Sequence, residues 1–214
     1  MGVLALFLAA CGPSPDAVPP SSSAQAEAVQ INPARIDRAR GELPEGYEVV
    51  GYTGPPAPAM VWSFAGTVVS EPAQCLVLAA PAVDPATKRG WSASGPGGIV
   101  YAVVARSSSP ELPGAALVGD CAHWTLRSGH TAGTVTAQPG PAIEAAQTVA
   151  MSAAVTTVVE GGTQTRSRAD TFVAYLAGYV CFIVLVTDPG SPNPTLGPGF
   201  AAELLVNVVS ALRG

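Results

Sequence analysis

The sequence predicts a single α+β domain over residues 31–214, with a mainly antiparallel sheet of about six to seven strands and helices packed on it. Runs rich in β-branched and aromatic residues follow one another through short turns rather than crossover helices, which favours antiparallel pairing. The 214 residues include 23 Gly and 21 Pro, too many breakers for long helices. The last stretch carries apolar residues at helical spacing, a stripe that packs against a sheet.

Seven runs have strand character, since β-branched and aromatic residues are frequent in them and glycine or proline turns separate several of them. They cover residues 47–52, 90–94, 99–106, 131–137, 148–159, 163–176 and 179–186. The last run, YVCFIVLV, is typical of a strand buried on both faces, and we place it in the middle of the sheet. The Gly161-Gly162 pair predicts a hairpin whose register sets Thr157 opposite Arg166 and Val155 opposite Arg168.

Four segments have helical character, and they cover residues 34–40, 71–79, 116–126 and 198–212. Asn32 and Pro33 form a cap and first-turn signal before the first segment. Ser70 is placed to cap the second. In the last, Leu204, Leu205 and Val208 belong to one apolar side.

The N-terminal segment predicts export and lipidation. Residues 3–10 form an uncharged apolar run of signal-peptide length, too short to span a bilayer. The tetrapeptide Leu8-Ala9-Ala10-Cys11 resembles the lipobox of bacterial lipoproteins, in which the cysteine thiol receives a diacylglycerol. We therefore assign residues 1–10 to a lipoprotein signal peptide. Residues 11–30 would be the lipidated Cys11 and a flexible Pro/Ser/Ala-rich tether, which anchors the domain to the outer face of the cytoplasmic membrane.

Composition excludes two classes of protein. Hydrophobic residues make up 48% of the chain and charged residues 12%, unlike a disordered acidic tail. The formal net charge is −5, so the basic footprint of a nucleic-acid binder is missing and we expect no nucleic-acid partner.

The cysteines other than Cys11 permit one disulfide, which would persist outside the cytoplasm. Cys181 lies in the apolar octet and resembles a small core residue, whereas Cys75 and Cys121 lie in mixed segments near turns. A bridge between Cys75 and Cys121 is favoured. The alternatives are a bridge that includes Cys181, or no bridge and therefore three free thiols.

The sequence contains no strong catalytic or metal motif, so we predict no catalytic residue, no metal site and no cofactor. Ser128, His130 and Asp120 lie close in sequence, but triads converge in space and this proximity alone is weak. The two histidines, His123 and His130, lack the companions of a zinc motif.

Three arginines form a candidate anion-binding patch. Arg166, Arg168 and Asp170 alternate along one predicted strand and therefore share a face of the sheet. Arg127 is a further candidate for the same patch. Guanidinium groups would receive a carboxylate or phosphate there, although a solvated face with cross-strand pairing is the alternative.

Four segments carry a family resemblance: INPARIDRARGELPEGYEVV, RGWSASGPGGIVYAVVA, TTVVEGGTQTRSRADTF and LVTDPGSPNP. Together they resemble a family of mycobacterial cell-envelope lipoproteins with a domain of unknown function. More distantly, the layout is similar to the PknH-like extracellular sensor domain. That likeness implies an antiparallel sheet with packed helices, a disulfide and a cleft, and it supplies no catalytic residue.

The sequence therefore predicts a lipid-anchored extracytoplasmic lipoprotein that binds a small molecule, a lipid or an envelope protein without catalysis. An envelope hydrolase with a Ser/His site is one alternative. A structural assembly factor is the other.

Overall fold

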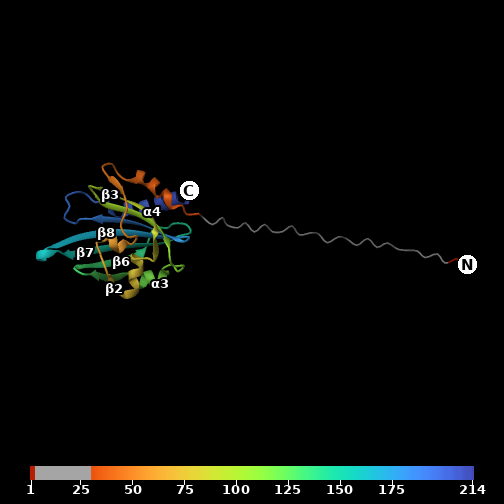
Figure 1. Cartoon of the computed structure of the whole chain (residues 1–214), viewed down its shortest axis with the longest axis horizontal. Helices are drawn as coiled ribbons and strands as arrows, with labels where there is room; N and C mark the ends of the chain where they lie inside the picture. Colours follow the sequence, from red (N-terminus) through yellow and green to blue (C-terminus); the bar gives the residue numbers. More distant parts are fainter. Residues whose placement is uncertain (3–29) are drawn as a thin grey trace.

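The computed structural model describes residues 1–2 and 30–214, and in that part of the chain nine strands form one sheet. Its order is β1-β3-β4-β9-β8-β7-β6-β5-β2, with every neighbouring pair antiparallel. Figure 1 shows this order from β3 near the top of the domain to β2 near the bottom. The strands are β1 (Glu48–Gly51), β2 (Val69–Glu71), β3 (Val83–Gly95), β4 (Gly98–Ser107), β5 (His123–Ser128), β6 (Thr131–Pro139), β7 (Gln147–Val158), β8 (Gln164–Leu176) and β9 (Tyr179–Thr187).

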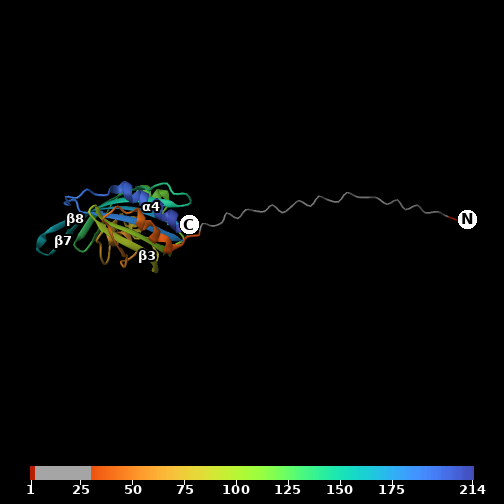
Figure 2. The ribbon, with the colours of Figure 1, turned by 90° about the horizontal axis from the view of Figure 1, so that it is seen from above.

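Helices cover both faces of the sheet, and each face has its own core. The described helices are η1 (Pro33–Glu42), α1 (Pro58–Val61), η2 (Ala73–Cys75), α2 (Leu76–Ala79), α3 (Ala115–Asp120), η3 (Glu160–Gly162) and α4 (Gly197–Arg213). On one face, α4 and η1 pack over β3, β4, β9 and β8, and Figure 2 shows α4 lying along that side. On the other face, the core includes side chains of α1, η2, α2 and α3 together with Trp62 and Phe64.

The predicted α+β class is confirmed, but the predicted strand count was too low. All seven predicted strands are present within longer or similar bounds. The two missed strands are β2 and β5, and the segments predicted as helices reached into both. In β5 the burial alternates from residue to residue, with Trp124 and Leu126 buried and Thr125 and Arg127 exposed, so period-two patterning overrides the helical interpretation.

The predicted hairpin register was wrong by one residue. Thr156 faces Arg166 and Ala154 faces Arg168, because three residues, Glu160 to Gly162, separate Val159 from Thr163. Gly161 and Gly162 both have positive φ, which glycine adopts readily, and with Glu160 they form a loop of three residues rather than two. A slip of one residue exchanges the faces of a strand. The correct register places the arginines opposite exposed or half-buried residues of β7 rather than opposite buried Val155.

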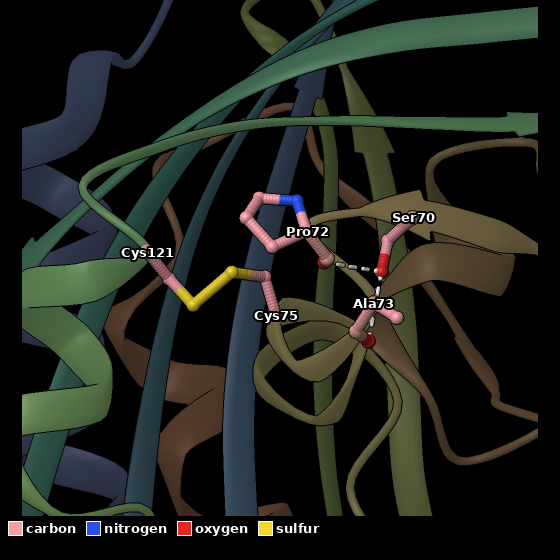
Figure 3. The surroundings of a disulfide bond; sticks show 5 residues. All are labelled: Ser70, Pro72, Ala73, Cys75 and Cys121. Atoms are coloured by element: carbon pink, nitrogen blue, oxygen red, sulfur yellow. Dashed lines mark hydrogen bonds between the residues drawn. A yellow bond between two sulfur atoms is a disulfide. The ribbon is translucent and has the colours of Figure 1, made fainter.

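Of the two predicted helical caps, the structure contains one. Asn32 caps η1 by accepting a hydrogen bond of 3.1 Å from the amide of Ala34, although η1 is a 3₁₀ rather than an α-helix. Ser70 does not cap a helix. It lies in β2, where its hydroxyl is within 3.0 Å of the carbonyl oxygens of Pro72 and Ala73 and donates to them (Figure 3).

Cys75 and Cys121 form a disulfide, which joins the end of η2 to the C-cap of α3 (Figure 3). This is the pair that the sequence favours. Cys181 is a buried free thiol in β9, the fourth strand of the sheet order and buried along most of its length. The octet therefore lies next to β8, the middle strand, and carries side chains of both cores.

The signal peptide, Cys11 and nearly all of the tether lie outside the described residues. Within residues 1–2 and 30–214, no helix has both the length and the apolar character to cross a bilayer.

Candidate functional site

Half of the sheet face that α4 occupies is left uncovered. The α4 core takes its buried strand residues mainly from β3, β4, β9 and β8, and includes only Ala150 from β7. Beyond it, β6 alternates from Thr131 to Gln138 between residues buried on the opposite face and residues exposed on this one. The exposed set points away from the core of Trp124 and Val135 and forms an open polar surface over β2, β5, β6 and β7.

A groove of about 750 Å³ lies on this surface. Its lining combines small and hydroxyl-bearing residues with one basic and one acidic side chain. The lining residues are Val69, Ser70, Glu71, Pro72, Ala73, Thr125, Leu126, Arg127, Ala132, Gly133, Thr134, Ala154 and Thr156. Because alanine and threonine side chains are short, the floor between the long side chains is low.

The strand register sets the candidate arginines in two parallel rows across the groove. One row runs Val69, Arg127, Ala132, Thr156 and Arg166. The next row runs Glu71, Thr125, Thr134, Ala154 and Arg168. Strands lie about 4.8 Å apart, so the backbones of Arg127 and Arg166 are separated by roughly 14 Å.

The three predicted arginines therefore share one face, but they do not form a single cluster. Arg127 lines the groove itself. Arg168 lines an adjoining pocket of about 180 Å³, which reaches Pro198 at the start of α4. Arg166 lies one strand beyond the groove residue Thr156 and is exposed.

Asp170 occupies the boundary between the open surface and the α4 core. It is 6% exposed, and its Oδ1 accepts a hydrogen bond of 2.8 Å from the hydroxyl of Ser152. The same oxygen lies 3.5 Å from Nε of Arg168, whose side chain is 58% exposed. The carboxylate thus holds one side of Arg168 and leaves the rest of the guanidinium in solvent.

A second acidic side chain, Glu71, lies at the β2 side of the groove. It is diagonal to Arg127 on the neighbouring strand. No salt bridge involves Arg127 or Arg166 within the described part of the chain. Both guanidinium groups therefore keep their donors available to a ligand.

The residues considered for a hydrolase do not assemble. Asp120 ends α3 before β5 begins, whereas Ser128 ends β5 and His130 follows it. A six-residue strand is about 17–20 Å long, so Asp120 and His130 lie at opposite ends of it. The hydroxyl of Ser128 donates to the carbonyl oxygen of Ala65.

The histidines are also apart. His123 begins β5 and His130 lies in the turn after it, and both are exposed. Among residues 1–2 and 30–214, no three His, Cys, Asp or Glu side chains gather closely enough to hold a metal ion.

Of the groove residues on β2, β5 and β6, sequence reasoning identified Arg127 as a candidate and missed the others. Glu71 and Thr125 were assigned to helices, so the face that they share with Arg127 was not recognised. The alternation of polar residues at Thr125, Arg127, Thr134 and Thr136 was the available signal.

Comparisons with known proteins add a family and a fold. A family model described as a domain of unknown function, DUF5642, matches residues 32–213. An X-ray structure of an uncharacterised protein from Mycobacterium smegmatis, described as an ortholog of Rv0999, is similar with a TM-score of 0.61 and 20% identity. The likeness covers 86% of this chain and 98% of that one, and at this identity it shows the fold.

The extracellular domain of PknH from Mycobacterium tuberculosis is also found, with a TM-score of 0.40 and 12% identity over 85% of this chain and 93% of that one. A search of the curated proteins found no match.

Proposed function

The chain belongs to the DUF5642 family of domains of unknown function, and from its own residues we propose that it binds an anionic ligand in the groove over β2, β5, β6 and β7. The ligand class is one that carries phosphate or carboxylate groups. The domain acts by binding and not by catalysis. It does so at the outer face of the cytoplasmic membrane, to which a lipid on Cys11 holds it.

One observation carries the proposal: the uncovered sheet face places Arg127 on one side of a low floor and Arg166 and Arg168 on the other. Arginine presents its donors in a planar fork that matches carboxylate and phosphate oxygens. Short threonine and alanine side chains between the walls leave room for the ligand and offer hydroxyl groups to it.

The charge distribution supports the same ligand class. The whole chain has a formal net charge of −5, yet three of its arginines lie along this one surface. The negative charge of Asp170 partly cancels the positive charge of Arg168, and Glu71 lowers the positive charge at one end of the groove. This pattern favours a ligand whose anionic group lies near Arg166 and Arg127, away from both carboxylates.

The non-catalytic role is supported by the placement of the polar side chains. The Ser128 hydroxyl is engaged by the backbone of Ala65, and Asp120 lies at the far end of β5 from His130. A nucleophile, a base and an orienting acid must lie within hydrogen-bonding reach of one another to support acyl transfer.

The membrane anchor is supported by the sequence of residues 8–11 and by the disulfide. Disulfides persist outside the cytoplasm and are rare inside it. Metabolic labelling with an alkyne fatty acid tests the anchor. We expect label on the native protein and its loss in Cys11→Ala, and label that persists in that variant would contradict the assignment.

Binding at the groove is tested by isothermal titration with inorganic pyrophosphate and with short-chain phosphatidate, which separate a free phosphate from a lipid headgroup. The test variant is Arg127→Gln/Arg166→Gln/Arg168→Gln. The matched control, Arg38→Gln/Arg40→Gln/Arg89→Gln, removes the same charge from exposed arginines elsewhere. We expect binding that weakens with salt, is lost in the test variant and survives in the control.

If both triple variants lose binding equally, the effect comes from net charge alone, and the groove assignment is overturned. Binding of neither probe by the wild-type protein would also overturn it. In that case crosslinking to envelope proteins would test the remaining candidate, a structural assembly factor.

A further inference from the structure

A smaller pocket lies beside the groove, where the open polar surface meets the start of α4. It has a volume of about 180 Å³ and spans β6, β7 and β8, which are neighbours in the sheet (Figure 1). The residues that line it and the residues that line the groove are different sets. The pocket is therefore a site of its own.

The strand register explains the shape of the pocket. Thr136, Ser152 and Asp170 lie directly opposite one another on β6, β7 and β8. The next row begins at Gln138 on β6 and ends at Phe172 on β8. Strands lie about 4.8 Å apart, so roughly 10 Å separates the backbones of β6 and β8. The β7 residues of both rows, a serine and an alanine, are short and leave a low floor between them.

Asp170 contributes a carboxylate oxygen that the protein leaves unpaired and open to the pocket. The residue is 6% exposed, and the partners of its carboxylate, the Ser152 hydroxyl and Nε of Arg168, both contact Oδ1. Oδ2 has no partner in the described part of the chain, and it is not among the unpaired side-chain atoms that are sealed from solvent there. A nearly buried carboxylate is stabilised when both oxygens accept hydrogen bonds. Oδ2 is therefore an acceptor that a donor from a ligand can reach.

The charges at the pocket favour a neutral ligand. Nε of Arg168 lies 3.5 Å from Oδ1 of Asp170, so one positive and one negative group share the same wall. The guanidinium group repels a bound cation, and the carboxylate repels a bound anion. A hydroxyl group suits this pair, because it donates to the carboxylate and accepts from the guanidinium group.

Apolar and polar surfaces lie on different parts of the lining. Ala150, Phe172 and Pro198 supply apolar surface from β7, β8 and the first turn of α4. Thr136 and Gln138 are exposed on the β6 side and carry a hydroxyl and an amide. A matching ligand has hydroxyl groups around its edge and carbon-bound hydrogens on its face, as a polyhydroxylated ring does. The size also agrees with a single ring, because cavities of about 150 Å³ hold benzene.

We propose that this pocket binds one neutral, polyhydroxylated six-membered ring, a sugar or a cyclitol. Neighbouring hydroxyl groups of the ring contact Oδ2 of Asp170 and the guanidinium group of Arg168. Gln138 and Thr136 contact hydroxyl groups on the β6 side. This site goes beyond the anion groove, because its ligand needs no charge.

Ligand-observed NMR titrations of the full chain test the site with four neutral probes: the methyl α-glycosides of glucose, mannose and galactose, and myo-inositol. The glycosides represent a sugar and myo-inositol represents a cyclitol. Because the probes differ in the stereochemistry of their hydroxyl groups, we expect one of them to bind more tightly than the others, with a dissociation constant in the millimolar range. Cyclohexanol, a ring with one hydroxyl group, is the control for apolar contact alone and should bind more weakly.

Asp170→Asn separates the ring site from the anion groove, because the two ligands should respond with opposite sign. The tightest ring probe should bind about 5- to 10-fold more weakly, since a neutral amide replaces the charged acceptor. Pyrophosphate should bind more tightly, since the variant removes a repulsive charge. Glu203→Gln removes the same charge from the exposed side of α4 and should leave ring binding within about twofold of wild type.

A second variant avoids the buried carboxylate, so it keeps the test valid if Asp170→Asn fails to fold. Gln138→Ala should weaken the ring probe by about threefold, because one neutral hydrogen bond is lost. Gln164→Ala, at an equally exposed glutamine near the β7–β8 hairpin, should leave it unchanged.

The two proposals fail separately. Binding of pyrophosphate without binding of any ring probe would overturn this inference and leave the groove proposal in place. Binding of a ring probe without pyrophosphate would do the reverse. Cyclohexanol that binds as tightly as the best ring probe, or ring binding that Asp170→Asn and Gln138→Ala both leave unchanged, would also overturn the inference.

Discussion

The indole Nε1 of Trp62 donates a buried hydrogen bond of 2.9 Å to the hydroxyl of Thr171, 109 residues later in the sequence. Trp62 is 1% exposed and Thr171 is fully buried. Thr171 belongs to β8, the middle strand of the sheet, so the bond attaches the segment after α1 to the centre of the fold. It also accounts for a polar side chain within an otherwise apolar core.

Replacing Thr171 by valine should destabilise the domain, because the shape is kept while the buried indole N–H loses its acceptor. We expect a loss of about 1–3 kcal/mol in the free energy of unfolding measured by urea denaturation. Thr171→Ser keeps the hydroxyl and serves as the control, with a smaller loss. Equal stability of the valine variant and wild type would show that the bond contributes nothing.

Removal of the disulfide should lower stability through the unfolded chain. The bridge joins residues separated by 46 positions, and the entropy relation for a loop of this length gives about 4 kcal/mol. Cys75→Ala/Cys121→Ala should show this loss in urea denaturation without reductant. If dithiothreitol does not destabilise the wild-type protein by a similar amount, the bridge is not formed in solution.

Cys181 should resist alkylation in the folded protein. It is fully buried, and desolvation raises the pKa of its thiol to about 12, so almost no thiolate exists at pH 8. Treatment with iodoacetamide followed by peptide mapping should leave the Cys181 peptide unmodified until urea is added. Rapid modification of the native protein, or a bridge that contains Cys181, would contradict this arrangement.

Gly98 should not tolerate a side chain. Its φ is +127°, and a Cβ built there would lie 2.5 Å from the carbonyl oxygen of Val186 on the neighbouring strand. Gly98→Ala is therefore expected to cost about 1–3 kcal/mol in thermal or urea unfolding. Gly41→Ala, which meets no atom within 4 Å, is the matched substitution and should change stability by less than about 0.5 kcal/mol.

The elements that the sequence predicts well are those whose pattern is long and local. β9 is a continuous apolar run, α4 has a helical stripe, and β7 and β8 flank a glycine turn. β2 has three residues and β5 has six, and the cysteines beside them lie in segments with helical composition. Short strands take their identity from the partner they pair with, and a single sequence does not reveal that partner.

The candidate sites were harder to predict for the same reason. The alternation of Arg166, Arg168 and Asp170 placed them on one face from sequence alone. That Arg127 lies across the groove from them depends on the order β8-β7-β6-β5, which pairing sets. That Gln138 and Ser152 join Asp170 in the adjoining pocket depends in the same way on the pairing of β6, β7 and β8.

Asp170→Asn should raise the affinity of the groove for anions. The variant removes the negative charge beside Arg168 but keeps an oxygen that accepts from Ser152. Removing one unit of repulsion at about 8 Å in a medium of intermediate dielectric constant strengthens binding by about fivefold. Pyrophosphate titrations at low and high salt measure the gain, which should shrink as salt rises.

Glu203→Gln is the control for this variant, because it removes the same charge from the exposed side of α4. Solvent screens Glu203, so its replacement should leave pyrophosphate affinity within about twofold. If Asp170→Asn weakens binding or leaves it unchanged, the bound anion does not lie beside Arg168. The contact would then have to come from Arg127 or Arg166, and their single variants would identify which, since the two lie on opposite sides of the groove.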